Sequence, residues 1–256
     1  MIGPLLEKLQ HYKDLDKHEI KMLRAAPTQE KRLERGSYII EAGENPPAVH
    51  LMIEGWACRC KMLSDGREQI MGYLIKGDLC DLHVTLLSRM DHSIRTITAT
   101  TVGMVPEESI NRIIEDFPRL ARALFWSLMV DEAIARHWIL NIGLRSAEAR
   151  VAHLFCELLV RFQVAGLIQD HTLEMPLTQA NLGEALSLTP VHVNRVLQRL
   201  RQKGLIRLTR KELTILDPEG LKNVAEFDAV YLHLDKNLAN DKGELINKKE
   251  KRILSL

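Results

Sequence analysis

Long runs of apolar residues are missing from this chain. No run reaches the roughly 20 residues of a membrane-spanning helix, and the first segment, MIGPLLEKLQHYKD, lacks the apolar core of a signal peptide. With 46% hydrophobic and 27% charged residues, the composition is ordinary for a globular protein, and 256 residues are enough for two domains. We therefore expect a cytoplasmic protein that has no membrane partner.

A strong net charge is also missing, but the charges are unevenly distributed. The formal net charge of the whole chain is +1. Residues 176–211, however, contain seven arginines and lysines and a single acid, Glu184. Such a local excess of positive charge indicates a surface for a polyanion.

The same segment carries the end signals of two short helices and a hairpin. Thr178 is a good N-cap for a helix over Gln179–Leu186. Thr189 followed by Pro190 begins a second helix, because proline at the first helical position loses no intrahelical hydrogen bond. Gly204 ends that helix, and the alternating residues after it predict a β-hairpin.

Helical periodicity gives the second helix two different faces. Val193, Val196, Leu197 and Leu200 fall on the side that meets the first helix. The opposite side holds a mostly polar set: Val191, Asn194, Arg195, Gln198 and Gln202.

These residues resemble the winged helix-turn-helix of the Crp/Fnr family of bacterial transcription regulators. The resemblance is strongest over residues 178–200, where the apolar and small positions of the motif are occupied by Leu182, Gly183, Leu186, Val193 and Val196. One position departs from the family pattern, since Ser187 stands in the turn where members often have glycine. That predicts a slightly costlier backbone.

The resemblance implies that different residues contact the bases and the backbone of double-stranded DNA. Base edges are expected to face Val191, Asn194 and Arg195. Thr178 and Gln179 are expected to contact phosphate through the helix N-terminus. The remaining backbone contacts are assigned to His192, Arg199, Arg201, Arg207 and Arg210, although His192 lies on the flank and suits either role.

Residues 36–106 change character, since short β-rich runs alternate with turn glycines. This pattern predicts a barrel or jelly roll, preceded by a helical start over residues 4–23. The fold class is therefore α+β: an N-terminal β-roll, a long helix and a C-terminal winged helix-turn-helix. In the Crp/Fnr family such a β-roll senses an effector.

From residue 118 a long helix is predicted to about residue 142, ending in a hinge at Asn141-Ile142-Gly143-Leu144. In the family this helix pairs with its twin. We expect a dimer seam that is interrupted by Asp131. It consists of Leu120, Leu124, Leu128, Ala135, Trp138 and Ile142. The predicted domains are a sensor over residues 1–117, the dimerisation helix and hinge over 118–143, the DNA-binding domain over 144–234, and a mobile charged tail over 235–256.

The sequence does not identify the effector. Cyclic-nucleotide binders of the family carry Gly-Glu-Leu and then Arg-Ser, and the corresponding positions here are Gly77-Asp78-Leu79 and His92-Ser93. The arginine that pairs with the cyclic phosphate is missing, and a largely neutral imidazole does not replace it. Arg89 and Arg95 lie nearby and are read as solvated surface charges. Control by cyclic AMP is therefore not expected.

The sequence gives little support for redox or haem sensing. The four cysteines are Cys58, Cys60, Cys80 and Cys156, so none lies near the N-terminus, where an Fnr-type iron–sulfur cluster needs most of its ligands. Cys58 and Cys60 share one side of a strand, which permits a redox pair, but buried apolar cysteines are the commoner case. His83 stands about where carbon-monoxide-sensing relatives ligate haem.

An enzyme is the main rival class, because jelly rolls also house metal-dependent active sites. His50, His83 and His92 show no paired ligand spacing, and no phosphate loop or activated nucleophile is visible. We therefore predict no enzymatic activity, no metal site and no cofactor. The prediction is a homodimeric regulator of palindromic sites that works with RNA polymerase; a cyclic-nucleotide module and a haem or redox sensor remain the alternatives.

Overall fold

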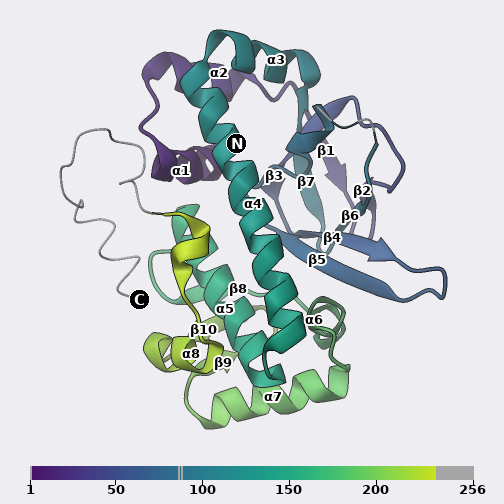
Figure 1. The fold of residues 1–256 in the computed structure, drawn as a ribbon, viewed down its shortest axis with the longest axis vertical. Helices are drawn as coiled ribbons and strands as arrows, with labels where there is room; N and C mark the ends of the chain where they lie inside the picture. Colours follow the sequence, from purple (N-terminus) through teal and green to yellow (C-terminus); the bar gives the residue numbers. More distant parts are fainter. Residues whose placement is uncertain (1, 86, 88, 235–256) are drawn as a thin grey trace. The chain divides into compact units, whose positions relative to one another are not determined.

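The computed structural model describes residues 2–85, 87 and 89–234 (Figure 1). The chain forms two compact units, one up to Asp131 and one from Glu132. The division falls inside a long helix, α4 (Pro118–Leu144), which contributes to both. The predicted tail, residues 235–256, lies outside the described residues.

The first unit begins with two helices, α1 (Gly3–Tyr12) and α2 (Lys17–Ala25), where the sequence analysis expected one helical segment. The break has a local cause. The Asp16 carboxylate accepts hydrogen bonds from the backbone N–H groups of His18 and Glu19, and the Glu19 side chain accepts one from the backbone of Asp16. This reciprocal capping box starts a new helix at Lys17.

Seven antiparallel strands follow in two sheets, which confirms the predicted β-roll (Figure 1). One sheet has the order β1 (Gln29–Leu33), β7 (Thr100–Pro106), β3 (Ala48–Glu54). The other has the order β2 (Tyr38–Ile40), β6 (Ser93–Thr96), β4 (Ala57–Met62), β5 (Glu68–Leu74). The chain crosses from the second sheet to the first between β6 and β7.

Two apolar clusters hold this unit together. One lies between the sheets and includes Ile40, Met52, Leu74, Ile94 and Val102. The other packs α1, α2, α3 (Glu107–Asp116) and the start of α4 against β3 and β7. Leu120 and Leu124 of α4 belong to this second cluster, so they are core residues of the first unit.

The second unit is built around α5 (Ala147–Val164), most of which is buried. Packed against it are α6 (Gln179–Leu186), α7 (Pro190–Gln202) and α8 (Pro218–Ala225). A sheet of order β8 (Thr172–Glu174), β10 (Glu212–Ile215), β9 (Ile206–Leu208) completes the α+β pattern, and a 3-10 turn, η2 (Ala229–Leu232), follows α8.

The predicted hinge at residues 141–144 is wrong, since α4 continues to Leu144. Asn141 is buried and donates a side-chain hydrogen bond to the Arg150 carbonyl at 3.3 Å, which holds this turn in place. The chain leaves the helix only at Arg145-Ser146, where Ser146 caps α5 as expected. Among the described helices, none combines the length and apolar character needed to cross a bilayer.

Candidate nucleic-acid interface and effector site

The N-terminus of α6 is closed by a capping box, in which Thr178 is the N-cap residue that the sequence predicted. The Thr178 hydroxyl accepts a hydrogen bond from the Asn181 N–H at 3.1 Å. In return the Asn181 side chain accepts one from the Thr178 N–H at 3.1 Å. Thr178 and Gln179 are both exposed, so the first turn of α6 is accessible to an anion.

A tight turn sets α7 beside α6. Ser187 adopts a left-handed backbone with φ of 54°, a conformation that is less favourable for serine than for glycine. At Gly183 an added Cβ would lie 2.5 Å from the Leu188 carbonyl oxygen. Only glycine therefore allows the turn to approach α6 this closely. The Leu188 N–H donates a hydrogen bond to the Gly183 carbonyl at 3.0 Å.

The two faces of α7 are placed as periodicity predicted. Thr189 caps the helix by accepting a hydrogen bond from the His192 N–H. The residues on the inner side of the helix are all buried: Val193, Val196, Leu197 and Leu200. On the outer side Val191 and Arg195 are exposed and Asn194 is half-buried. An apolar residue, an amide and a guanidinium on one exposed helix face are groups that contact base edges.

Positive charge continues from α7 onto the β9–β10 hairpin. Lys203 pairs with Glu148 at 2.6 Å. Among the described residues, the other six bases of this segment have no acidic partner, and all six are exposed: Arg195, Arg199, Arg201, Arg207, Arg210 and Lys211. Cations left unpaired beside a polar helix face are typical of a surface that contacts phosphates.

Comparison with known proteins agrees with this geometry. Residues 149–224 match the Crp-like helix-turn-helix domain, and residues 30–117 match the cyclic nucleotide-binding domain. A probable transcriptional activator of Rhizobium leguminosarum bv. viciae is 27% identical over 76% of this chain and 80% of its own. The nitrogen fixation regulation protein FixK of Bradyrhizobium diazoefficiens is 29% identical over 74% of this chain and 79% of its own.

The chain belongs to the Crp/Fnr family. The solved structure of FixK2 from Bradyrhizobium japonicum shares the fold, with a TM-score of 0.68 and 24% identity over 77% of this chain and 96% of that one. The Crp/Fnr family consists of transcription regulators and not of enzymes. This member is accordingly a DNA-binding transcription regulator, as the sequence analysis concluded.

In this Crp/Fnr protein the place of the family's ribose-binding turn is covered by α1. A Cβ on Gly77 would lie 2.7 Å from the Pro4 Cβ. Asp78 is 4% exposed, and its carboxylate accepts hydrogen bonds from the Lys8 ammonium at 2.5 Å and from the Ile75 N–H at 2.7 Å. Leu79 is part of the core. These three residues are packed against α1 and the core of the first unit, and their assignment to an effector pocket stays a prediction.

The phosphate side of the expected pocket is also occupied. The Ser93 hydroxyl accepts a hydrogen bond from the Ala42 N–H at 2.9 Å. Arg95, read from the sequence as a solvated charge, is instead paired with the largely buried Glu68. Arg89 is exposed, as expected. Among the described residues, His92 thus stands where these binders carry arginine, and Arg95 is already paired with Glu68.

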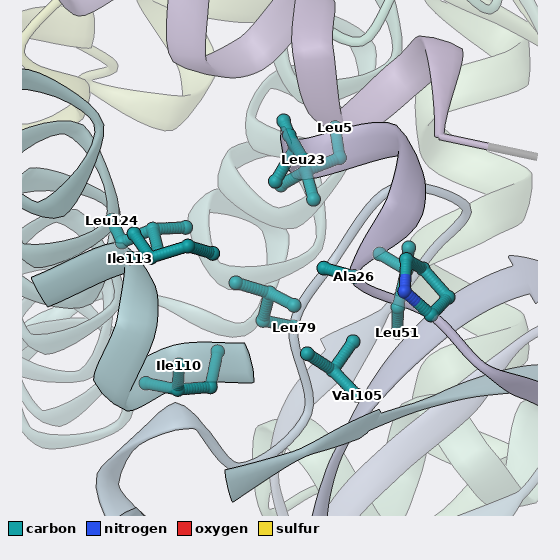
Figure 2. Close-up of a pocket in the computed structure, with 10 residues that line it drawn as sticks. Leu5, Leu23, Ala26, Leu51, Leu79, Val105, Ile110, Ile113 and Leu124 are labelled. Carbon is teal, nitrogen blue, oxygen red and sulfur yellow. The ribbon is translucent and has the colours of Figure 1, made fainter. Parts of the chain in front are cut away.

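The first unit also contains a small cavity between α1, α2, α3, α4 and the β3–β7 sheet (Figure 2). Its volume is about 10 Å³, roughly the space of one water molecule. Every lining residue is apolar: Leu5, Leu23, Ala26, Pro27, Leu51, Leu79, Val105, Ile110, Ile113 and Leu124. It is a packing defect that offers no polar anchor for a nucleotide.

The cysteines behave as small core residues. All four are free and buried. The hydrogen bond of the Cys58 thiol with Cys60, together with burial, raises the pKa of Cys58. Burial raises the pKa of the Cys156 thiol to about 12. A thiol that stays protonated is a poor nucleophile. The structure therefore favours the packing interpretation over the redox pair.

The long helix α4 exposes a different apolar set from the one expected at the seam. Leu120 and Leu124 are buried in the first unit, and Trp138 is buried in the second, where its indole N–H donates to Glu157 at 3.1 Å. Leu128 and Ile142 are half-buried, and Ala135 is exposed. The large exposed apolar residues of α4 are Phe125, Met129, Ile139, Leu140 and Leu144.

Proposed function

We propose that this Crp/Fnr protein acts as a cytoplasmic homodimer that places α7 of each protomer in the major groove of a palindromic DNA site. The observation that carries the proposal is the exposed face of α7, with Val191, Asn194 and Arg195, surrounded by bases that have no acidic partner. A recognition helix in the groove, with cations flanking it on the phosphates, is the docking geometry of this motif.

The proposed contacts follow from position. Val191, Asn194 and Arg195 read base edges, and the first turn of α6 at Thr178 and Gln179 holds a phosphate. His192, Arg199 and Arg201 of α7, and Arg207 and Arg210 of the hairpin, hold the DNA backbone. Residues 144–234 then form the DNA-binding domain and residues 1–117 the sensor.

Selection of genomic fragments by the purified full-length protein tests the function directly. We expect recovered fragments to share a two-fold symmetric sequence with half-sites about one helical turn apart, roughly 34 Å. Gel shifts with the recovered duplex and with a scrambled duplex of equal length and composition then measure specificity. Equal affinity for both duplexes would contradict sequence-specific recognition. Because the family acts on transcription, RNA polymerase is the proposed further partner.

Dimerisation is proposed through α4. Its large exposed apolar residues form two groups, Phe125 with Met129 and Ile139 with Leu140 and Leu144, and the Glu132–Arg136 ion pair lies between the groups. We accordingly propose Phe125, Met129 and Ile139 for the seam, together with Leu128, Ala135 and Ile142 from the sequence analysis. Asp131, the expected interruption, is paired with Arg59 at 2.8 Å and is thereby neutralised within the first unit.

Substitution of two arginines is expected to separate base reading from backbone binding. Arg195→Ala should cost roughly 1–3 kcal/mol on the selected site and flatten the preference at one base pair per half-site. Arg207→Ala is the matched control, since it removes the same group from the hairpin. It should weaken binding to all duplexes about equally and reduce the salt dependence.

Fluorescence anisotropy on the selected duplex, single-base variants and a scrambled duplex, each at several salt concentrations, distinguishes the two effects. An Arg195→Ala protein that loses the same factor on every duplex would show that Arg195 holds phosphate. The base-reading assignment would then be withdrawn.

Cyclic nucleotides are expected neither to bind tightly nor to alter DNA affinity. Lys8 and α1 occupy the Asp78 side, and Arg95 is paired with Glu68, so a cyclic phosphate would lack its charged partner. Calorimetric titration with cyclic AMP and cyclic GMP should show no micromolar binding. A tenfold gain in operator affinity, about 1.4 kcal/mol, on adding either nucleotide would mean that α1 moves aside and that the pocket is functional.

A further inference from the structure

Two histidines of the first unit, nine positions apart in the sequence, have neighbouring rings with unsatisfied nitrogens. His83 lies in a 3-10 turn, η1 (Leu82–Thr85), and His92 directly precedes β6. Their ring centroids are 5.8 Å apart. The Nε2 atom of each ring is buried and has no hydrogen-bond partner among the described residues. A buried nitrogen without a hydrogen-bond partner is unfavourable, so the pair indicates a missing ligand.

Asp91 adds a carboxylate to the pair. Its Oδ1 atom lies 2.9 Å from the His92 Nδ1 atom. One ligand atom from each of His83, Asp91 and His92 lies within 4.8 Å of the other two. The His92 side chain is nine-tenths buried, whereas that of Asp91 is exposed. The cluster is therefore fixed on one side and open to solvent on the other.

We propose that His83, Asp91 and His92 bind one divalent transition-metal ion of the zinc class. Two imidazoles and one carboxylate are a donor set that zinc accepts, with bonds of about 2.0–2.2 Å and a fourth position left for water. Ligand atoms around one such ion lie roughly 3.3 Å apart. The three ligand atoms now lie within 4.8 Å of one another, so their separations have to shorten by up to roughly 1.5 Å, through rotation of the His83 and Asp91 side chains.

The donor set excludes the other common classes of ligand. Calcium and magnesium prefer six or more oxygen ligands, and this cluster offers a single carboxylate. Haem requires a large apolar pocket beside the ligating ring, and neither histidine lines the small apolar cavity described above. A bridging water is the remaining alternative, and it would leave the purified protein without affinity for metal.

Neighbouring charged groups are already committed elsewhere and do not compete for the ion. Asp81 accepts hydrogen bonds from the backbone N–H and the ring of His50, both at 2.7 Å. Arg59 pairs with Asp131. The Lys61 ammonium donates to the backbone carbonyl of Asp91 and leaves its carboxylate oxygens for the metal.

Metal titration of the full-length protein tests the site. Chelator-treated protein is titrated with zinc by calorimetry and with cobalt(II) by absorption spectroscopy. We expect one ion per chain. His92→Gln and Asp91→Asn should weaken binding at least tenfold, and Asp91→Asn is the safer variant because this side chain is exposed and supports no core. His18→Gln, an exposed histidine on α2, is the matched control and should bind as the wild type does.

The cobalt spectrum identifies the ligands independently of affinity. Nitrogen and oxygen ligation gives d–d bands without thiolate charge transfer, and these bands should be lost in His83→Gln. The proposal is overturned if the wild type fails to bind, if the His83, Asp91 and His92 variants bind as tightly as the wild type while remaining folded by circular dichroism, or if a thiolate band shows that the buried cysteines hold the ion.

Discussion

Ile139→Glu is expected to convert the protein from a dimer to a monomer and to lower its affinity for a full palindrome by about 100-fold or more. Ile139 is 74% exposed in the single chain, so a glutamate there does not disturb the monomer's own core. In a dimer through α4 the carboxylate would be buried without a partner, which is unfavourable by several kcal/mol. Binding through one half-site forfeits the avidity of two linked sites, a factor of about 10²–10⁴.

Analytical ultracentrifugation and gel shifts on full and half palindromes measure the two consequences. Val230→Glu is the matched control, because Val230 is a similarly exposed aliphatic residue that lies outside α4. It should leave both the assembly and the DNA affinity unchanged. If Ile139→Glu remains dimeric and retains full affinity, the seam does not include this part of α4.

His153→Phe is expected to stabilise the second unit and to reduce its sensitivity to acid. His153 is 1% exposed, neither ring nitrogen has a hydrogen-bond partner among the described residues, and the ring packs on Phe227 and Tyr231. Phenylalanine keeps the ring contacts and removes two buried unsatisfied atoms. The expected gain at neutral pH is about 1–3 kcal/mol in the free energy of unfolding.

The pH dependence has a definite sign. Burial, together with the charge of Arg145 and the neighbouring His137, lowers the pKa of His153 to about 3. Below pH 6.5 the unfolded chain therefore takes up a proton that the folded chain does not bind, and stability falls as the pH falls toward 3. Each pH unit in this window costs up to about 1.4 kcal/mol.

Urea unfolding of the wild type and the variant at pH 7.5 and pH 5 measures this difference. The wild type should lose roughly 2 kcal/mol more than His153→Phe between these two values. His18→Phe changes an exposed histidine and is expected to leave the difference between the two pH values as in the wild type. Parallel losses in wild type and His153→Phe would mean that His153 does not remain neutral inside the folded unit.

The helix-turn-helix was predictable because its signals are local. Thr178, Thr189 and Pro190 mark helix starts through their own backbone chemistry, and the predicted bounds Gln179–Leu186 agree with the structure. The strand β1 was missed for the opposite reason. Its residues are almost all exposed and polar, so only its pairing with β7 makes it a strand.

The helix α4 and the effector region show what periodicity leaves undetermined. Helical spacing groups apolar residues onto faces, but α4 has more than one apolar face, and only packing shows that Leu120 points into the core while Phe125 does not. The contact between His83 and His92 likewise depends on how the chain folds back, since they are nine positions apart. No spacing rule for metal ligands covers that case, which is why the sequence suggested no metal site.

The unpaired cations on α7 and on the β9–β10 hairpin also lower the stability of the free protein. In the free protein these like charges repel one another, and no acid among the described residues relieves them apart from Glu148 at Lys203. Replacing Arg199 or Arg201 with neutral residues would reduce that repulsion and would also weaken binding to the DNA backbone. Selection for operator affinity and selection for thermal stability therefore act in opposite directions on the same few side chains.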